Sequence, residues 1–128
     1  VERLHAHPEL GKRLFWLEGI SDEYLEKVYA ASTCLIAASY GEGFGLPLIE
    51  AAQHKLPIIA RDIPVFREVA GTHAYYFSAT AASDLAQSLN NWLGLFRIDQ
   101  HHKSDAMPWQ SWKTSAARLM GFVLNLNA

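Results

Sequence analysis

Two acidic side chains, Glu42 and Glu50, flank a short glycine-rich segment and are the groups in this sequence best suited to ligand chemistry. Glycines stand at positions 41, 43 and 45 of this segment. Because glycine has no Cβ, the backbone here can approach a ligand closely. The apolar residues that follow predict a helix, whose first turn offers unpaired amide N–H groups and the positive end of the helix dipole. The segment is therefore suited to bind a phosphate group.

The two carboxylates indicate a second kind of ligand group. A carboxylate close to a phosphate repels it, so Glu42 and Glu50 are better suited to accept hydrogen bonds from the hydroxyl groups of a sugar or a ribose. Seven residues separate them, so they would reach different parts of one ligand. Phosphate together with several hydroxyls indicates a nucleotide sugar. A purely structural interpretation stays open, because glycine turns and an acidic residue early in a helix are favourable without any ligand.

The elements that must position this segment alternate between strands and helices. Short apolar runs predict strands over residues 14–17, 33–38, 56–60 and 74–77, and the second has the pattern of a strand covered on both sides. Helices are predicted from a cap at Ser21 to residue 31, over 47–54 and 64–69, after a cap at Thr80 or Ser83, and after a cap at Ser111. This alternation predicts an α/β fold with a doubly wound, Rossmann-like parallel sheet. Ligands of such sheets bind at the carboxyl ends of the strands, where the glycine segment follows the run 33–38.

Other conspicuous residues are expected to be structural. Cys34 lies in an apolar run and is expected to be a small core residue. The six histidines have no metal-ligand spacing and are expected to be solvated, so no metal is predicted. Trp92 and Trp112 lie on amphipathic faces and are expected to pack, whereas Tyr40 either lines a pocket or flanks the turn. The glycine spacing is not the dinucleotide fingerprint, so a nicotinamide cofactor is not indicated.

Composition sets the broad class of protein. The 128 residues are 50% hydrophobic and 19% charged, which predicts one folded domain over residues 1–128. A net charge of −2 argues against nucleic acid as a partner. One cysteine, no apolar run of membrane-spanning length and no signal-peptide pattern favour a cytoplasmic location. The first residue is not methionine, and we expect the chain to be a fragment of a longer protein.

The segment Glu42-Gly43-Phe44-Gly45-Leu46-Pro47-Leu48-Ile49-Glu50-Ala51 resembles the E-x7-E signature of retaining glycosyltransferases of family 4. The similarity continues along most of the chain, in Trp16-Leu17-Glu18-Gly19-Ile20-Ser21-Asp22, in Tyr29 with Ala31, in residues 56–60, in Asp62-Ile63-Pro64, in Arg67-Glu68-Val69 with Gly71, and in Trp109-Gln110-Ser111-Trp112. The chain departs from the family pattern at Ala38-Ser39, where the family has Pro-Ser, and at Lys55-Leu56, where it has a small residue. Neither departure alters the E-x7-E spacing.

The resemblance implies the GT-B fold, of which this chain would be the second half of the donor-binding domain. It implies that Glu42 contacts the donor hexose near the reacting centre and that Glu50 binds the ribose. The diphosphate would be held at Gly43, Phe44, Gly45 and Leu46, and Ile20 would lie beside the nucleobase.

The partners implied are a UDP- or GDP-hexose donor and a carbohydrate or lipid-linked acceptor, with no metal or other cofactor. The implied setting is bacterial surface polysaccharide synthesis, with mannosyl transfer as one option and a peripheral position at the inner face of the membrane as another. The chain alone is expected to be inactive and to self-associate through exposed apolar edges. Alternatives are a non-catalytic nucleotide-sugar-binding module and a GT-B-fold sugar-nucleotide epimerase or hydrolase.

Overall fold

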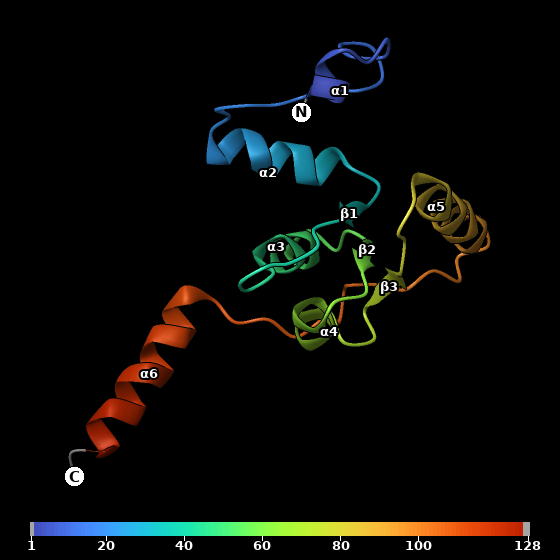
Figure 1. Ribbon diagram of the computed structural model, residues 1–128. Helices are drawn as coiled ribbons and strands as arrows, with labels where there is room; N and C mark the ends of the chain where they lie inside the picture. Colours follow the sequence, from blue (N-terminus) through green and yellow to red (C-terminus); the bar gives the residue numbers. More distant parts are fainter. Residues whose placement is uncertain (1, 127–128) are drawn as a thin grey trace. The chain divides into compact units, whose positions relative to one another are not determined.

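The structure is a computed structural model that describes residues 2–126, and the chain divides into two compact units, Val1–Ala31 and Ser32–Ala128 (Figure 1). Within the described range, every helix is too short or too polar to cross a lipid bilayer.

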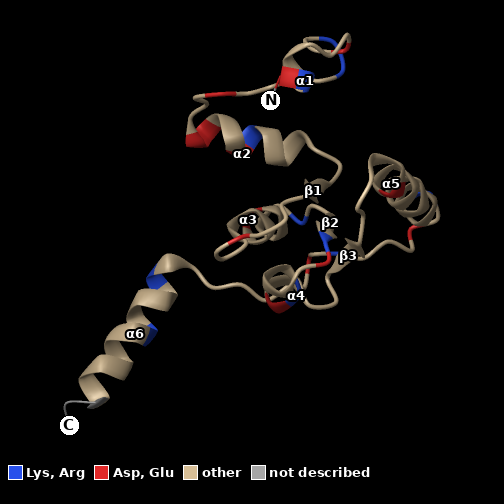
Figure 2. Cartoon of the chain, in the orientation of Figure 1, with Lys and Arg blue, Asp and Glu red and all other residues tan. Residues whose placement is uncertain are grey.

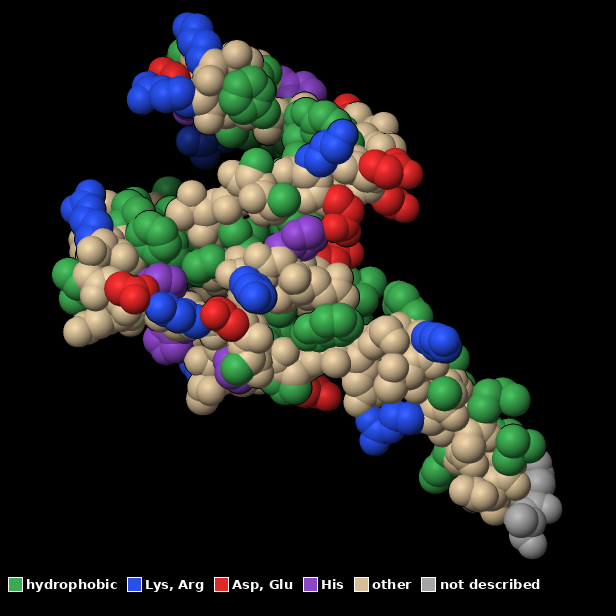
Figure 3. Space-filling model, turned by 180° about the vertical axis from the view of Figure 1, so that it is seen from behind, with side chains coloured by type: hydrophobic (Ala, Val, Ile, Leu, Met, Phe, Trp, Pro, Cys, Tyr) green, Lys and Arg blue, Asp and Glu red, His purple; other side chains and the backbone are tan. Residues whose placement is uncertain are grey.

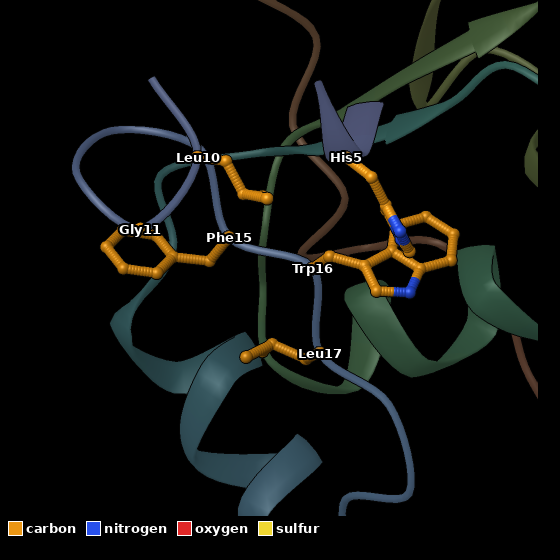
Figure 4. A pocket seen from close by; sticks show the side chains of 6 residues that line it. All are labelled: His5, Leu10, Gly11, Phe15, Trp16 and Leu17. Carbon is orange, nitrogen blue, oxygen red and sulfur yellow. The ribbon is translucent and has the colours of Figure 1, made fainter. Parts of the chain in front are cut away.

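The N-terminal unit contains the helices α1 (Glu2–His5) and α2 (Asp22–Ala31). The predicted cap of α2 is confirmed, because the Tyr24 amide donates to Ser21 Oγ at 3.3 Å. The predicted buried strand over residues 14–17 is wrong. Leu14 forms an isolated bridge to Leu10, and the three residues after it are exposed. They join no strand in the described part of the chain and instead line an apolar hollow of about 460 Å³ (Figure 4).

The C-terminal unit holds a parallel sheet with strand order β1-β2-β3: β1 (Leu35–Ala37), β2 (Ile58–Arg61) and β3 (Ala74–Phe77). Leu35 pairs with Ile58, which in turn pairs with Ala74, so the three strands start at one level. The helices are α3 (Leu46–Gln53), α4 (Pro64–Ala70), α5 (Ala82–Arg97) and α6 (Trp112–Leu126). The predicted α/β fold with a parallel sheet is confirmed.

Helices cover both faces of this sheet, with α3 and α4 on one side and α5 on the other (Figure 1). On the α5 side, Ile59 packs with Phe77, Ala79 and Trp92, and Cys34 lies against this cluster as predicted for a core residue. Neighbouring residues of a strand point to opposite faces. Ile58 and Ala60 therefore face the other side, where the buried residues of α3 and α4 are Leu48, Ala51, Ala52, Phe66 and Ala70.

The strand β1 is less covered than its continuous apolar run predicts. Ile36 is 44% exposed. It is in register with Ile59, whose face is covered by α5. The helix α5 packs against β3, and β1 lies at the opposite edge of the sheet, so α5 does not cover β1.

Proline and glycine set the limits of α4 as predicted, whereas the predicted cap of α5 is wrong. Pro64 opens α4 and Gly71 ends it. At α5 the capping group is neither Thr80 nor Ser83. Asp84, in the first turn, accepts hydrogen bonds from the backbone amides of Ala81 at 3.0 Å and Thr80 at 3.2 Å. These bonds lower the pKa of the Asp84 carboxyl. The capping carboxylate therefore comes from the first turn of the helix itself. The sequence prediction looked for a hydroxyl residue at the start of the helix and did not identify Asp84.

Two further expectations for aromatic and histidine side chains are wrong. Trp112 does not pack: it is 77% exposed, and the apolar face of α6 is open (Figure 3). Ser111 does cap this helix, since its Oγ accepts from the Thr114 amide at 3.1 Å. His101 is not solvated, because its side chain is only 9% exposed and its ring lies 4.9 Å from the ring of Phe96.

Candidate functional site

The glycine segment forms the loop of residues 38–45, which leaves the carboxyl end of β1 and leads into α3. The strands are parallel, so the carboxyl ends of β2 and β3 lie at the same edge of the sheet. Figure 2 colours an acidic position red in the loop ahead of α3 and a basic position blue at β2. The structure therefore places this loop where α/β sheets bind their ligands.

The end of the loop is fixed by backbone geometry. Gly45 precedes α3 with φ 74°, the left-handed conformation that glycine adopts without strain, and its carbonyl accepts from the Leu48 amide at 3.0 Å. A Cβ at Gly45 would lie 3.5 Å from side-chain carbons of Phe66 and Val69 on α4, which is an ordinary van der Waals contact. Pro47 lies in the first turn of α3, as predicted.

The middle of the loop is open. A Cβ at Gly41 or Gly43 would meet no atom of the described residues within 4 Å. Among those residues, no acceptor receives the backbone amides of Phe44, Gly45 or Leu46. These amides begin a helix, so an anion that approached here would meet unpaired donors and the positive end of a dipole.

The two glutamates differ in their surroundings. Glu42 is exposed, and its Oε1 accepts a hydrogen bond from Ser39 Oγ at 2.9 Å. Glu50 is half-buried and lies on α3, four residues after Leu46. Residues 42–46 and Glu50 thus lie on one continuous segment that runs from the loop into α3. Ile20 belongs to the N-terminal unit, where it is half-buried ahead of Ser21.

Arg61 is a residue at this edge that the sequence reasoning missed. Its Nε donates to the carbonyl of Ala38 at 3.0 Å, and its Nη1 donates to the carbonyl of Ala79 at 2.6 Å. Its guanidinium carbon lies 3.9 Å from the centre of the Tyr40 ring. The sequence did contain a feature that could have identified it: an arginine stands directly after the apolar run 56–60, at the carboxyl end of a predicted parallel strand.

The residues described here include no group of three or more histidine, cysteine, aspartate or glutamate side chains that would hold a metal ion. The chemical groups that the site offers are unpaired amides, the carboxylates of Glu42 and Glu50, and the guanidinium of Arg61.

A parallel sheet with helices on both faces and an open amide row at the carboxyl end of a strand is the arrangement in which α/β domains commonly bind phosphate groups. The chain belongs to the GT-B-type family described as glycosyl transferases group 1, because residues 1–101 match the model of that family. Its relatives include the "Serotype-specific mannosyltransferase WbdA" of Escherichia coli, 56% identical over 119 residues that cover 93% of this chain. The "O-antigen chain mannosyltransferase RfbU" of Salmonella typhimurium is 34% identical over 71% of this chain.

This chain spans 15% of the length of that WbdA relative and 26% of the length of RfbU. Among solved structures, a sucrose-phosphate synthase from Thermosynechococcus elongatus is similar, with a TM-score of 0.73 at 22% identity. The similar region covers 98% of this chain and 34% of the synthase, and at this identity it shows the fold alone.

Proposed function

We propose that this chain is the donor-binding portion of a larger retaining glycosyltransferase of family 4. The enzyme would transfer mannose from a nucleoside-diphosphate sugar to an acceptor hydroxyl during bacterial surface polysaccharide synthesis. The observation that carries the proposal is the row of unpaired amides at residues 44–46, flanked along the chain by Glu42 and Glu50. The relatives WbdA and RfbU are named mannosyltransferases, which supports the choice of mannose. GDP-mannose is therefore the first donor to test, followed by UDP-hexoses.

The proposed chemistry follows from where charge develops. As the bond between the anomeric carbon and the diphosphate oxygen breaks, negative charge collects on the diphosphate and positive charge on the sugar ring. Fixed amide donors at the start of α3 stabilise the departing diphosphate and need no reorganisation during the reaction. The amides and the dipole supply this stabilisation from the protein itself, so we propose that no metal ion is required.

The glutamates would hold the two sugar rings. Glu42, oriented by Ser39 at 2.9 Å, would accept hydrogen bonds from hexose hydroxyls beside the reacting carbon. Glu50, near the start of α3, would accept them from the ribose hydroxyls. Gly43 lets the diphosphate approach the amides of Phe44, Gly45 and Leu46. Ile20 would contact the nucleobase. The acceptor would be bound mainly by parts of the enzyme outside this chain, so we expect the 128-residue chain alone to be inactive.

The test separates binding from turnover in the complete enzyme that contains this segment. Glu42→Gln should mainly lower kcat, whereas Glu50→Ala should mainly raise the donor KM. A hydrogen bond to a charged group is worth about 1.5–3 kcal/mol, so each effect should be about 10- to 150-fold. Asp105→Asn, in the exposed loop after α5, is the matched control and should behave like the wild type.

Three results would count against the proposal. Unchanged kinetics in both glutamate variants would remove the site assignment. Donor binding without any transfer by the complete enzyme would favour a non-catalytic binding module. Conversion of the donor at an equal rate with and without an acceptor alcohol would favour an epimerase or hydrolase.

A further inference from the structure

The side chain of Arg61, at the carboxyl edge of the sheet, contacts the first residues of the glycine loop, although Arg61 is not part of that loop. We infer that Arg61 is the positioning residue of this loop: it fixes the loop's first residues so that Glu42 and the open amides meet the donor in one arrangement. This inference rests on the proposed donor site, and it concerns a residue to which that proposal gives no role.

The guanidinium joins the ends of all three strands. Arg61 is the last residue of β2, Ala38 directly follows β1, and Ala79 lies two residues after β3. Nε and Nη1 donate to the carbonyls of Ala38 and Ala79 at 3.0 and 2.6 Å. A planar guanidinium presents donors in two fixed directions, whereas a lysine ammonium is a compact charge without this fork. The two bonds therefore depend on the arginine side chain itself.

The face of the same guanidinium holds an aromatic side chain of the loop. Its carbon lies 3.9 Å from the centre of the Tyr40 ring and 5.2 Å from that of the Phe77 ring. These distances are within the range of cation–π attraction. The Tyr40 side chain is 79% exposed, so its position depends on this stacking more than on burial.

These contacts hold the residues on both sides of Ser39, the residue that orients Glu42. Ser39 lies between Ala38, whose carbonyl Arg61 binds, and Tyr40, whose ring Arg61 stacks on. Ser39 Oγ donates to Glu42 Oε1 at 2.9 Å. A continuous series of contacts therefore runs from Arg61 to the carboxylate that would face the donor hexose.

The loop needs such a contact because of its composition. Glycine loses more backbone freedom on ordering than any other residue, and three glycines stand at positions 41, 43 and 45. Gly45, which is buried and whose carbonyl accepts from the Leu48 amide, anchors the far end of the loop. Arg61 supplies the anchor at the near end, so its loss should release residues 39–43 while the sheet and α3 remain folded.

The test compares Arg61→Ala and Arg61→Lys with Arg67→Ala. Arg67 is the matched control because it makes the same kinds of contact away from the loop: two bonds to Asp62 at 2.7 and 2.8 Å, and stacking on Tyr76 at 3.8 Å. The order parameters of the backbone amides of residues 39–45, which report motion on the ps–ns timescale, are measured by NMR relaxation in the 128-residue chain. The donor kcat/KM with GDP-mannose and the Tm are measured in the complete enzyme.

Both Arg61 variants should reduce the order parameters of the loop amides and lower kcat/KM at least tenfold, whereas Arg67→Ala should do neither. Lysine should fail to rescue, because it restores the charge without the fork. Tyr40→Ala should reproduce part of the loss and add little to Arg61→Ala, since the two side chains act as one unit.

The inference is overturned if Arg61→Ala matches Arg67→Ala in the loop order parameters and in kcat/KM while the wild type is active. It is also overturned if Arg61→Lys restores kcat/KM, because charge rather than geometry would then be responsible. If the wild-type enzyme neither binds nor transfers a sugar nucleotide, the proposed function fails. The loop order parameters of the three variants still decide whether Arg61 holds the loop.

Discussion

Two glycines of the same loop should respond in opposite ways to replacement by alanine. Gly45 has φ 74° and packs against α4, whereas Gly43 has no positive φ and open space where a Cβ would stand. Gly45→Ala is therefore a perturbation of folding, and Gly43→Ala is a perturbation of the surface that the donor would approach.

The structure gives the size of each effect. At Gly45 the new Cβ would lie 3.5 Å from Phe66 and Val69, an ordinary contact, so the cost is the left-handed backbone and not a clash. That conformation costs an alanine about 1–2 kcal/mol, of which part is offset by the lower entropy of the unfolded chain. We expect a net loss of about 1 kcal/mol, or a Tm lower by roughly 4 °C for a domain of this size. Gly43→Ala should leave stability equal or up to about 1 kcal/mol higher.

Donor binding should show the reverse order. A methyl group at residue 43 would occupy space through which the diphosphate reaches the amides, and an affinity loss of about tenfold corresponds to about 1.4 kcal/mol. The Cβ at residue 45 would face α4, so Gly45→Ala should weaken binding less. Thermal unfolding by circular dichroism in the 128-residue chain and calorimetric titration of the complete enzyme with GDP measure the two quantities, with Gly41→Ala as a further open-position variant.

The reasoning fails if Gly45→Ala has the same Tm as the wild type, because the backbone at residue 45 would then not require glycine. It also fails if Gly43→Ala is the less stable of the two, since that residue would then be packed. Unchanged GDP affinity in Gly43→Ala, with stability as expected, would refute the donor site while leaving the loop geometry intact.

Two further predictions concern the core around the sheet. Burial raises the pKa of the Cys34 thiol, so less thiolate is present at pH 8 and iodoacetamide should alkylate the folded chain more slowly than the urea-unfolded chain; equal rates would contradict this. The hydroxyl of Ser104, a residue only 1% exposed, donates to the Leu56 carbonyl at 2.8 Å, so Ser104→Ala should lower the free energy of unfolding by about 1–3 kcal/mol in urea titrations. Ser78→Ala, at an exposed position, should change it by less than about 0.5 kcal/mol, and equal losses in the two variants would argue against the buried bond.

Local sequence signals predicted most of the elements of the C-terminal unit. The strand over residues 74–77 is confirmed at both ends, and Pro64 and Gly71 mark the limits of α4 as expected. These signals act through φ, through missing donors and through apolar runs, all of which are properties of a few neighbouring residues. The errors at residues 14–17 and Trp112 have a different cause. Hydrophobic side chains indicate that burial is favourable, but they do not say which element provides the cover.

The order of residues along the chain determined the glycine loop, its place after a strand, and the two glutamates on either side of the unpaired amides. Tertiary structure alone decided that Arg61 lies beside this loop, because its carbonyl partners are 23 and 18 residues away in sequence. The register of three parallel strands brings those carbonyls to one edge, and a side chain that ends the middle strand reaches both. Contacts between residues so far apart exist only once the sheet has formed, and no short motif encodes them.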